Sequence, residues 1–152
     1  MSRQKSIPDA IALRYSEKFA PPEGTIATHL NILKTHGFVW YGKIGKTISN
    51  KVIADLLNKG ETRLLLIDSG KTDRYWADVV SIVKEKPDGY YPDYYSRFVD
   101  DIKTWFKITG ISKASNDVLS HCTVTSSGAL LTTASKHSMS PFFIINVEDN
   151  YL

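Results

Sequence analysis

Two apolar segments that follow each other in the middle of the chain limit its fold more than any other feature. Residues 63–67, "RLLLI", are almost continuously apolar and precede a Ser-Gly pair, as in a buried strand that ends at a turn. Residues 73–85 instead alternate, with Tyr75 and Ala77 on one face, which is the period of a strand. The sequence therefore predicts two neighbouring strands joined by a turn at 69–73.

Further strands and three helices are expected around this pair. Strand character is found at four other places: residues 38–44, 102–112, 119–128 and 140–149. Helices are expected at residues 10–15 after Pro8, at 25–36 with Thr25 as the cap and Gly37 at the end, and from about Ser49 to Gly60. The polar stretch 135–140 is expected to be a connection. This order predicts an α+β fold, with a small, curved, mostly antiparallel β-barrel-like sheet and helices packed outside.

The chain as a whole has the size and composition of one domain in an aqueous compartment. At 152 residues we expect a single domain, 1–152, with 1–24 as an N-terminal helical extension and 25–150 as the core. Its apolar fraction is 42%, no apolar run approaches the roughly 20 residues of a membrane span, and no signal peptide is recognisable. Cys122 is the single cysteine, which excludes an internal disulfide. These features fit a cytoplasmic location, and a formal charge of +3 permits a nucleic-acid partner.

The segment "GKT" at 45–47 resembles the end of a nucleotide-binding P-loop but lacks its beginning. A P-loop needs an earlier glycine, because the backbone amides between its two glycines curl around a phosphate. The matching position is Trp40, which the pattern places in a strand, and Asp68 is the only candidate for a magnesium-binding acid. What remains is the expectation that Lys43 and Lys46 hold a nucleic-acid phosphate without hydrolysing anything.

No other group of residues has the spacing of a catalytic or metal site. His121 and Cys122 are adjacent in a predicted strand, so their side chains point to opposite faces and form no dyad. The acids within 93–101 are more typical of a solvated loop, and His29 is more typical of a packed core histidine than of a metal ligand. The sequence predicts a non-catalytic binding domain with no cofactor and no metal.

The most unusual local composition is "DGYYPDYYSRF" at residues 88–98, where four tyrosines surround one proline. The Asp-Gly, Pro-Asp and Ser-Arg pairs in this segment are typical of an exposed turn. Exposed aromatic rings beside basic residues stack nucleic-acid bases, and each stacked base contributes about 1–3 kcal/mol. The alternative is that these tyrosines close one end of the sheet with their hydroxyls in water.

The order of these segments resembles the EVE and YTH domains of the PUA-like superfamily. The resemblance covers about residues 25–112 and is carried by the "GFVWYGKI" strand, the "RLLLIDSGKTDRYWADVVSIVKE" pair, Tyr91-Pro92-Asp93 and the strand with Trp105. The lead-in "TIATHLNILKTHGFVWYGK" is also similar to the N-terminal DNA-reading domains of McrB-type, modification-dependent restriction systems. The resemblance implies a sheet barrel with a pocket that takes one base, often methylated, between aromatic walls.

The resemblance also implies roles for positions in this chain. Residues expected at the base pocket are Trp40, Tyr41, Asp68, Ser69, Trp76, Tyr90, Tyr91, Tyr94 and Tyr95. Phosphate contacts are expected from Lys43, Lys46, Lys71, Arg74 and Arg97. Trp76 and Trp105 are at the same time sheet positions of the kind that fill a core.

The chain departs from the family pattern at Asp68-Ser69, where EVE domains have His-Ser, and in having tyrosines where the YTH cage has tryptophans. A carboxylate accepts but cannot donate, so Asp68 would favour adenine or cytosine, which present an amino group. The expected partner is double-stranded DNA with a flipped, modified base. The domain is expected to recognise this base as the specificity module of a restriction or defence system, with any motor or nuclease in a partner. No membrane partner is expected. The alternatives are a PUA-like RNA-binding module and, less favoured, a small nucleotide-binding enzyme.

Overall fold

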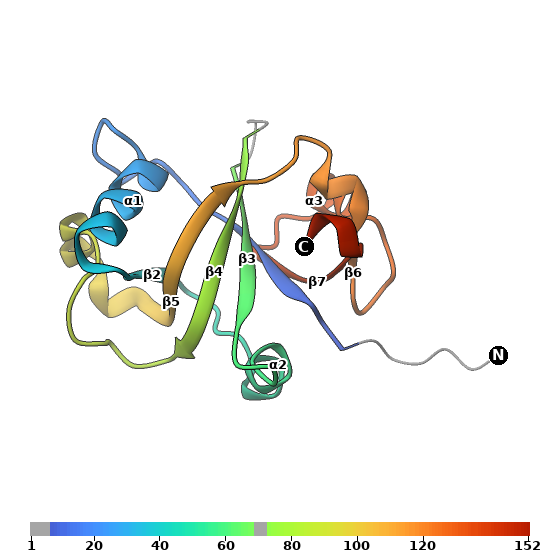
Figure 1. The fold of residues 1–152 in the computed structure, drawn as a ribbon, viewed down its shortest axis with the longest axis horizontal. Helices are drawn as coiled ribbons and strands as arrows, with labels where there is room; N and C mark the ends of the chain where they lie inside the picture. The colour runs from blue at the N-terminus through green and yellow to red at the C-terminus, as the bar shows by residue number, and fades with distance from the viewer. Residues whose placement is uncertain (1–6, 69–72) are drawn as a thin grey trace.

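A seven-stranded sheet is the framework of the protein in a computed structural model, which describes residues 7–68 and 73–152 (Figure 1). The strands lie in the order β2-β5-β4-β3-β1-β7-β6. They are Ala10–Arg14 (β1), Val39–Ile44 (β2), Thr62–Ile67 (β3), Arg74–Val83 (β4), Ile102–Lys113 (β5), Cys122–Val124 (β6) and Phe142–Val147 (β7). β1 and β3 pair in parallel, and the other neighbours pair antiparallel. The predicted α+β class is confirmed, with a mixed sheet that is mostly antiparallel.

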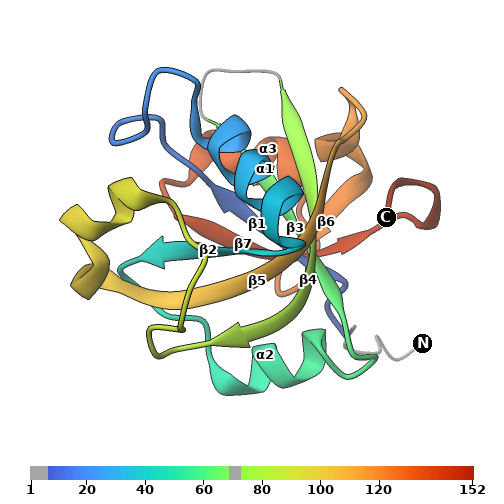
Figure 2. The ribbon, with the colours of Figure 1, turned by 60° about the vertical axis from the view of Figure 1, so that its left-hand side comes forward.

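The sheet curls around one apolar core without closing. Side chains from β1 to β5 meet in this core, among them Leu13, Tyr41 and Phe106, although β1 and β2 are not neighbours in the sheet. Figure 2 shows β5 bending across the front of the molecule toward β2. In the described residues β2 and β6 remain the two edges of the sheet, so the predicted barrel-like closure is not confirmed.

The helix predicted at residues 10–15 is wrong, because this segment forms β1. β1 lies between β3 and β7, with Ile11 opposite Leu64 on one side and opposite Ile144 on the other. Successive residues of β1 pack into two different apolar clusters, so both of its faces are buried. A strand that is buried on both faces shows a continuous apolar run, and periodicity alone cannot distinguish such a run from a buried helix.

α1 (Thr25–His36) lies where the sequence predicts it, but its first turn is capped differently. Gly37 follows the helix with a φ of 83°, the left-handed conformation that glycine adopts without strain. Thr25 is the first helical residue and not the cap. The carboxylate of Glu17 accepts hydrogen bonds from the N–H of Thr25 at 2.8 Å and from the hydroxyl of Thr25 at 2.7 Å. Glu17 therefore caps the start of α1 from outside the helix.

α2 (Asn50–Leu56) and α3 (Leu131–His137) cover other parts of the sheet. α2 begins next to Ser49 as predicted but ends at Leu56 and not at Gly60, and the hydroxyl of Ser49 caps it by accepting a hydrogen bond from the N–H of Val52 at 3.2 Å. The sequence does not predict α3, in which Leu131 is the one buried residue and most of the others are polar. Figure 1 places α1 and α3 at opposite ends of the sheet. None of the helices in the described ranges is long and apolar enough to cross a membrane.

Four short 3-10 segments complete the described chain: Asp93–Arg97 (η1), Val99–Asp101 (η2), Val118–His121 (η3) and Asp149–Tyr151 (η4). Two smaller apolar clusters lie beside the main core. One, between β1, β3, β7 and α3, holds Trp76. The other is largely aromatic and packs Trp40 of β2 and Trp105 of β5 against Tyr95 of η1. η1 is therefore fastened to the edge of the sheet by aromatic rings.

Candidate functional site

A hollow of about 210 Å³ opens where β1 ends, between β2 and η1. Six aromatic side chains line it: Tyr15, Phe19, Tyr41, Tyr94, Tyr95 and Phe98. Polar lining comes from Arg14, Ser16, Thr25 and Lys43. We call this hollow the aromatic pocket. Mostly apolar walls with a few polar groups are typical of ligand sites. The volume of the aromatic pocket is below the roughly 300 Å³ of pockets for drug-sized molecules, so it suits a ligand with one flat ring system.

The alternation of β2 decides which of its two aromatic residues reaches the pocket. Successive strand residues point to opposite faces, so Trp40 and Tyr41 diverge. Tyr41 points into the curled core beside His29, with ring centroids 5.0 Å apart. Trp40 packs on the other face with Trp105. Tyr41 is therefore a wall of the aromatic pocket, and Trp40 supports η1 from behind.

A buried hydrogen-bond chain fixes the wall made by Tyr95. The Nδ1 atom of His29 lies 2.8 Å from the carbonyl oxygen of Thr25, and its Nε2 atom lies 2.8 Å from the hydroxyl of Tyr95. A carbonyl only accepts, so Nδ1 carries the proton and Nε2 accepts from Tyr95. The same hydroxyl accepts from the N–H of Gly42 at 3.1 Å. Burial lowers the pKa of His29 to about 4, so this ring is neutral near pH 7.

The tyrosine hydroxyls of the pocket stay protonated. Burial raises the pKa of Tyr15, Tyr41 and Tyr94 above the usual value of tyrosine. The carboxylates of Asp68 and Glu17 raise the pKa of Tyr15 and Tyr41 further, so both carboxylates act on this side of the pocket. Neutral hydroxyls donate hydrogen bonds and carboxylates attract donors, so the pocket suits a flat ligand with both acceptors and amino groups on its edge.

The rings at the mouth of the pocket remain open to solvent. Phe19 is 41% exposed, and its ring lies 5.1 Å from that of Phe98. Tyr94 meets Tyr95 edge to face, with centroids 5.1 Å apart. The ammonium of Lys18 lies 5.4 Å from the ring of Phe19. Accessible rings beside a cation are the arrangement that proteins use to stack single-stranded bases.

The structure brings together four of the residues predicted for the site: Tyr41, Lys43, Tyr94 and Tyr95. Asp68 follows β3 and acts on the pocket tyrosines through its charge, although it does not line the hollow. Trp76 is buried in the cluster beneath α3, which agrees with its reading as a core position. Ser69 lies outside the described residues, as does Lys71.

Tyr90 and Tyr91 begin the aromatic segment but turn away from the pocket. Tyr90 is 45% exposed and stacks on His36 with ring centroids 3.7 Å apart. Its φ of 21° is positive, a conformation that residues other than glycine seldom adopt. Tyr91 packs against Trp105 at 5.2 Å. Both tyrosines line another hollow beside α1, which shares Tyr94 with the aromatic pocket.

Lys43 and Lys46 are neighbours in space but differ in exposure. Lys43 is only 4% exposed, and its ammonium donates to the carbonyl oxygens of Lys46 and Ile44. Burial and the charge of Lys46 lower the pKa of Lys43. The exposed Lys46 lies 5.9 Å from the ring of Phe142, and Lys43 lies 4.9 Å from the same ring. A bound phosphate would therefore meet Lys46 first.

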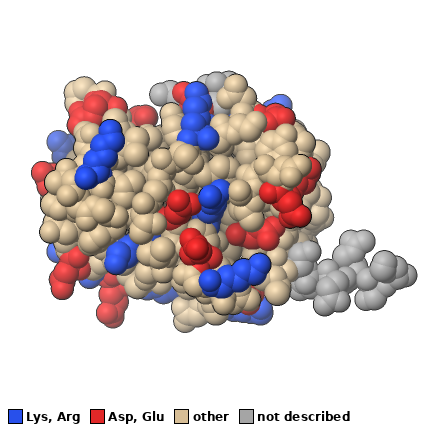
Figure 3. Space-filling view, viewed as in Figure 1, with Lys and Arg blue, Asp and Glu red and all other residues tan. Residues whose placement is uncertain are grey.

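The other basic residues predicted to contact phosphate are dispersed. Arg97 is exposed in η1, next to Phe98 of the pocket. Arg74 begins β4. Figure 3 shows acidic and basic side chains intermingled on the face turned to the viewer, without a large area of one sign. Phosphate contacts would come from single residues near the pocket and not from a broad basic surface.

Sequence reasoning missed the pocket residues that follow β1 and end η1: Tyr15, Ser16, Phe19 and Phe98. The helix predicted at residues 10–15 conceals the first three, whereas Phe98 stands at the end of the aromatic segment 88–98. The apolar run at 10–13 fits a buried strand as well as a buried helix, so the sequence alone does not place Tyr15 at the end of a strand.

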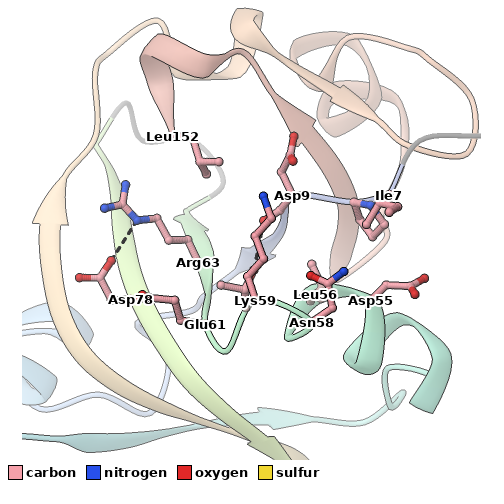
Figure 4. A pocket seen from close by; sticks show the side chains of 12 residues that line it. Ile7, Asp9, Asp55, Leu56, Asn58, Lys59, Glu61, Arg63, Asp78 and Leu152 are labelled. Atoms are coloured by element: carbon pink, nitrogen blue, oxygen red, sulfur yellow. Dashed lines mark hydrogen bonds and ion pairs between the residues drawn. The ribbon is translucent and has the colours of Figure 1, made fainter.

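Other places in the described chain offer less chemistry. The hollow in Figure 4, between Ile7, Arg63 and Leu152, has no aromatic lining, and its Arg63 and Asp78 pair with each other at 2.9 Å. Burial raises the pKa of Cys122 to about 12, which makes this thiol inert. No group of three metal-ligating side chains occurs in the described ranges. Residues 40–44 are paired strand, so no phosphate loop precedes Gly45.

Comparison with known proteins agrees with this architecture. Residues 11–143 match the family described as Pua-like. No curated protein and no solved structure matches the chain significantly. The match spans most of the chain, from β1 to β7, and includes every strand that borders the aromatic pocket. The chain therefore belongs to the Pua-like family, whose domains are in general nucleic-acid-binding modules and not enzymes.

Proposed function

We propose that this protein reads nucleic acid by taking one flipped, modified base into the aromatic pocket. The observation that carries the proposal is the pocket itself, six aromatic side chains around about 210 Å³ at the open side of the curled sheet. Membership of the Pua-like family supports a nucleic-acid ligand. The mouth of the pocket is formed by accessible rings, so a base can enter from solvent.

The energetics of base flipping match what these walls can supply. Removing a base from its stack costs a few kcal/mol. Stacking on an aromatic side chain returns about 1–3 kcal/mol per base, and here Phe19, Tyr94 and Phe98, which are exposed or half-buried, present more than one ring. A methyl group on the base adds about 0.8 kcal/mol when it is buried against such rings. A modified base would therefore bind about fourfold more tightly than the plain one through this term alone.

The edge of the base would be read by the polar groups around the pocket. The hydroxyls of Tyr15 and Tyr41 can donate to ring nitrogens or carbonyls, and Asp68 and Glu17 favour a ligand with amino groups. Adenine and cytosine present such an amino group beside a ring nitrogen that accepts, whereas thymine has no amino group and guanine has a donating N–H beside its own. We therefore propose methylated adenine or cytosine as the base.

We further propose double-stranded DNA as the substrate and a restriction or defence system as the setting. This part rests on the similarity of residues 25–43 to the DNA-reading domains of modification-dependent restriction systems. Lys46 and Arg97, both exposed near the pocket, would hold the phosphates beside the flipped base. Cleavage would then belong to a partner.

The test is a binding panel of plain and methylated oligonucleotides, as DNA duplex, single-stranded DNA and RNA, at low and high salt. Binding through the backbone alone weakens steeply with salt, and a pocket adds a difference between methylated and plain ligands. Tyr94→Ala should abolish that difference. Tyr151→Ala, a tyrosine near the C-terminus that lines none of the pocket, is the matched control. Equal binding of every oligonucleotide, or binding of none, would refute the proposal, and preference for RNA would refute its DNA part.

A further inference from the structure

A second hollow of about 620 Å³ lies directly beside the aromatic pocket, between α2 and β7. We call it the side groove. The two hollows adjoin along two chain segments: Lys43 and Pro141 line the aromatic pocket, whereas Lys46, Ser140 and Phe142 line the side groove. A strand of nucleic acid that delivers a base to the pocket must place its neighbouring nucleotide close to this boundary.

The lining of the side groove combines the three kinds of group that a nucleotide needs. Its apolar surface comes from Val52, Val124, Phe142, Phe143 and Ile144. Hydroxyls are supplied by Thr125, Ser126, Ser138 and Ser140, ammonium groups by Lys46 and Lys51, and one carboxylate by Asp55. Hydroxyls and ammonium groups donate to phosphate oxygens, and an apolar ring offers a base a face to stack on.

Positive charge at the boundary has no carboxylate partner in the described part of the chain. Lys51 pairs with Asp55 at 2.8 Å, but no ion pair among the described residues involves Lys43 or Lys46. The ammonium groups of Lys43 and Lys46 lie 4.9 and 5.9 Å from the ring of Phe142. The ammonium of Lys43 is buried beside that of Lys46 without a counter-ion, which is costly. An anion bound next to these two lysines would therefore be favoured.

One wall of the side groove is held rigid by a residue of the aromatic pocket. The guanidinium of Arg14 donates to the carbonyl oxygens of Ser135 at 2.7 Å, Ser138 at 2.8 Å and Ser140 at 2.9 Å. Arg14 itself lines the aromatic pocket. The wall is thus preformed relative to the pocket, which reduces the entropy lost when a ligand spans both.

We infer that the side groove is a second nucleotide subsite, in which Lys46 holds the phosphate and Phe142 stacks the base of the nucleotide adjacent to the one in the aromatic pocket. The inference rests on the proposed function and goes beyond it, because it assigns a further site and sets the smallest full ligand as a dinucleotide. Charge selects this occupant: the lysines at the boundary lack acidic partners, so an anionic strand fits better than an apolar segment of protein.

The experiment compares two probes, a methylated nucleoside and a short single-stranded oligonucleotide centred on the same base. Lys46→Gln should weaken oligonucleotide binding about tenfold, reduce the slope of its salt dependence by about one, and leave nucleoside binding unchanged. Ser126→Trp places a large side chain in the side groove and should weaken oligonucleotide binding by a similar factor. Lys84→Gln removes an exposed lysine that lines neither hollow and should change neither probe.

Two results would overturn the inference. If the nucleoside binds and oligonucleotide affinity is unchanged in both Lys46→Gln and Ser126→Trp, the base pocket stands and the side groove is not part of the site. If these variants change the sedimentation of the free protein and not its oligonucleotide affinity, the side groove is a contact between copies of the chain. Absence of nucleoside binding in the unaltered protein would instead count against the proposed function itself.

Discussion

Acidification should destabilise this protein through one buried histidine. His29 is neutral in the folded protein, with its pKa lowered from 6.5 to about 4 by burial, whereas in the unfolded chain it titrates near 6.5. Between these two values the unfolded state binds more protons, so the free energy of unfolding falls as the pH falls from about 6.5 to about 4. The difference corresponds to about 3 kcal/mol, at about 1.4 kcal/mol per pH unit.

The assay is urea unfolding at a series of pH values between 7 and 4, on the unaltered protein and on His29→Gln. Carboxylates titrate in the same range, and the comparison removes them because both proteins carry the same ones. His29→Gln should be less stable at pH 7, because it disturbs the hydrogen bonds that link His29 to Thr25 and Tyr95. Its free energy of unfolding should, however, depend less on pH. If the free energy of unfolding depends on pH in the same way in both proteins, burial does not hold His29 neutral. The tautomer assigned to His29 would then be wrong as well.

Three further substitutions probe the support of the pocket. Tyr95→Phe leaves the N–H of Gly42 and the Nε2 of His29 unpaired, so unfolding should become easier by about 1–3 kcal/mol in a denaturation experiment. Gly42→Ala places a Cβ atom 2.8 Å from two carbons of Ile102, which should cost about 1–3 kcal/mol of stability and weaken base binding in the same preparation. Glu17→Ala removes the acceptor at the start of α1 and should cost about 1 kcal/mol, measured by thermal unfolding, with Glu23→Ala as the control; equal losses in the two would contradict this role.

Most of the fold follows from local signals in the sequence. The alternation of β4, the glycine after α1 and the serine before α2 each act over a few residues, so they can be read without the tertiary structure. β1 could not be read in this way, because its strand conformation depends on pairing with Leu64 of β3 and Ile144 of β7, far along the chain. α3 lacks an apolar face and is likewise fixed by its packing.

Some residues of the candidate site can likewise be identified from local sequence, whereas others need the tertiary structure. The tyrosine-rich segment stands out by composition, and Tyr94 and Tyr95 indeed line the pocket. Tyr90 and Tyr91 come from the same segment but precede η1 and pack elsewhere, Tyr90 on His36 and Tyr91 on Trp105. Tyr15 directly follows β1, and only the curled sheet brings it beside η1. Composition could identify the segment, whereas the selection within it needed the tertiary structure.

The reading of a modified base in the aromatic pocket is tested by calorimetry, as the affinity of the isolated protein for a methylated nucleoside and for its plain counterpart. A nucleoside carries no phosphate, so this measurement isolates the aromatic pocket from all backbone contacts. Methylated deoxyadenosine or deoxycytidine should bind several-fold more tightly than the plain nucleoside, and Tyr94→Ala should remove the difference. Equal affinity for methylated and plain nucleosides, with the protein folded, would contradict the claim that the pocket reads a modified base.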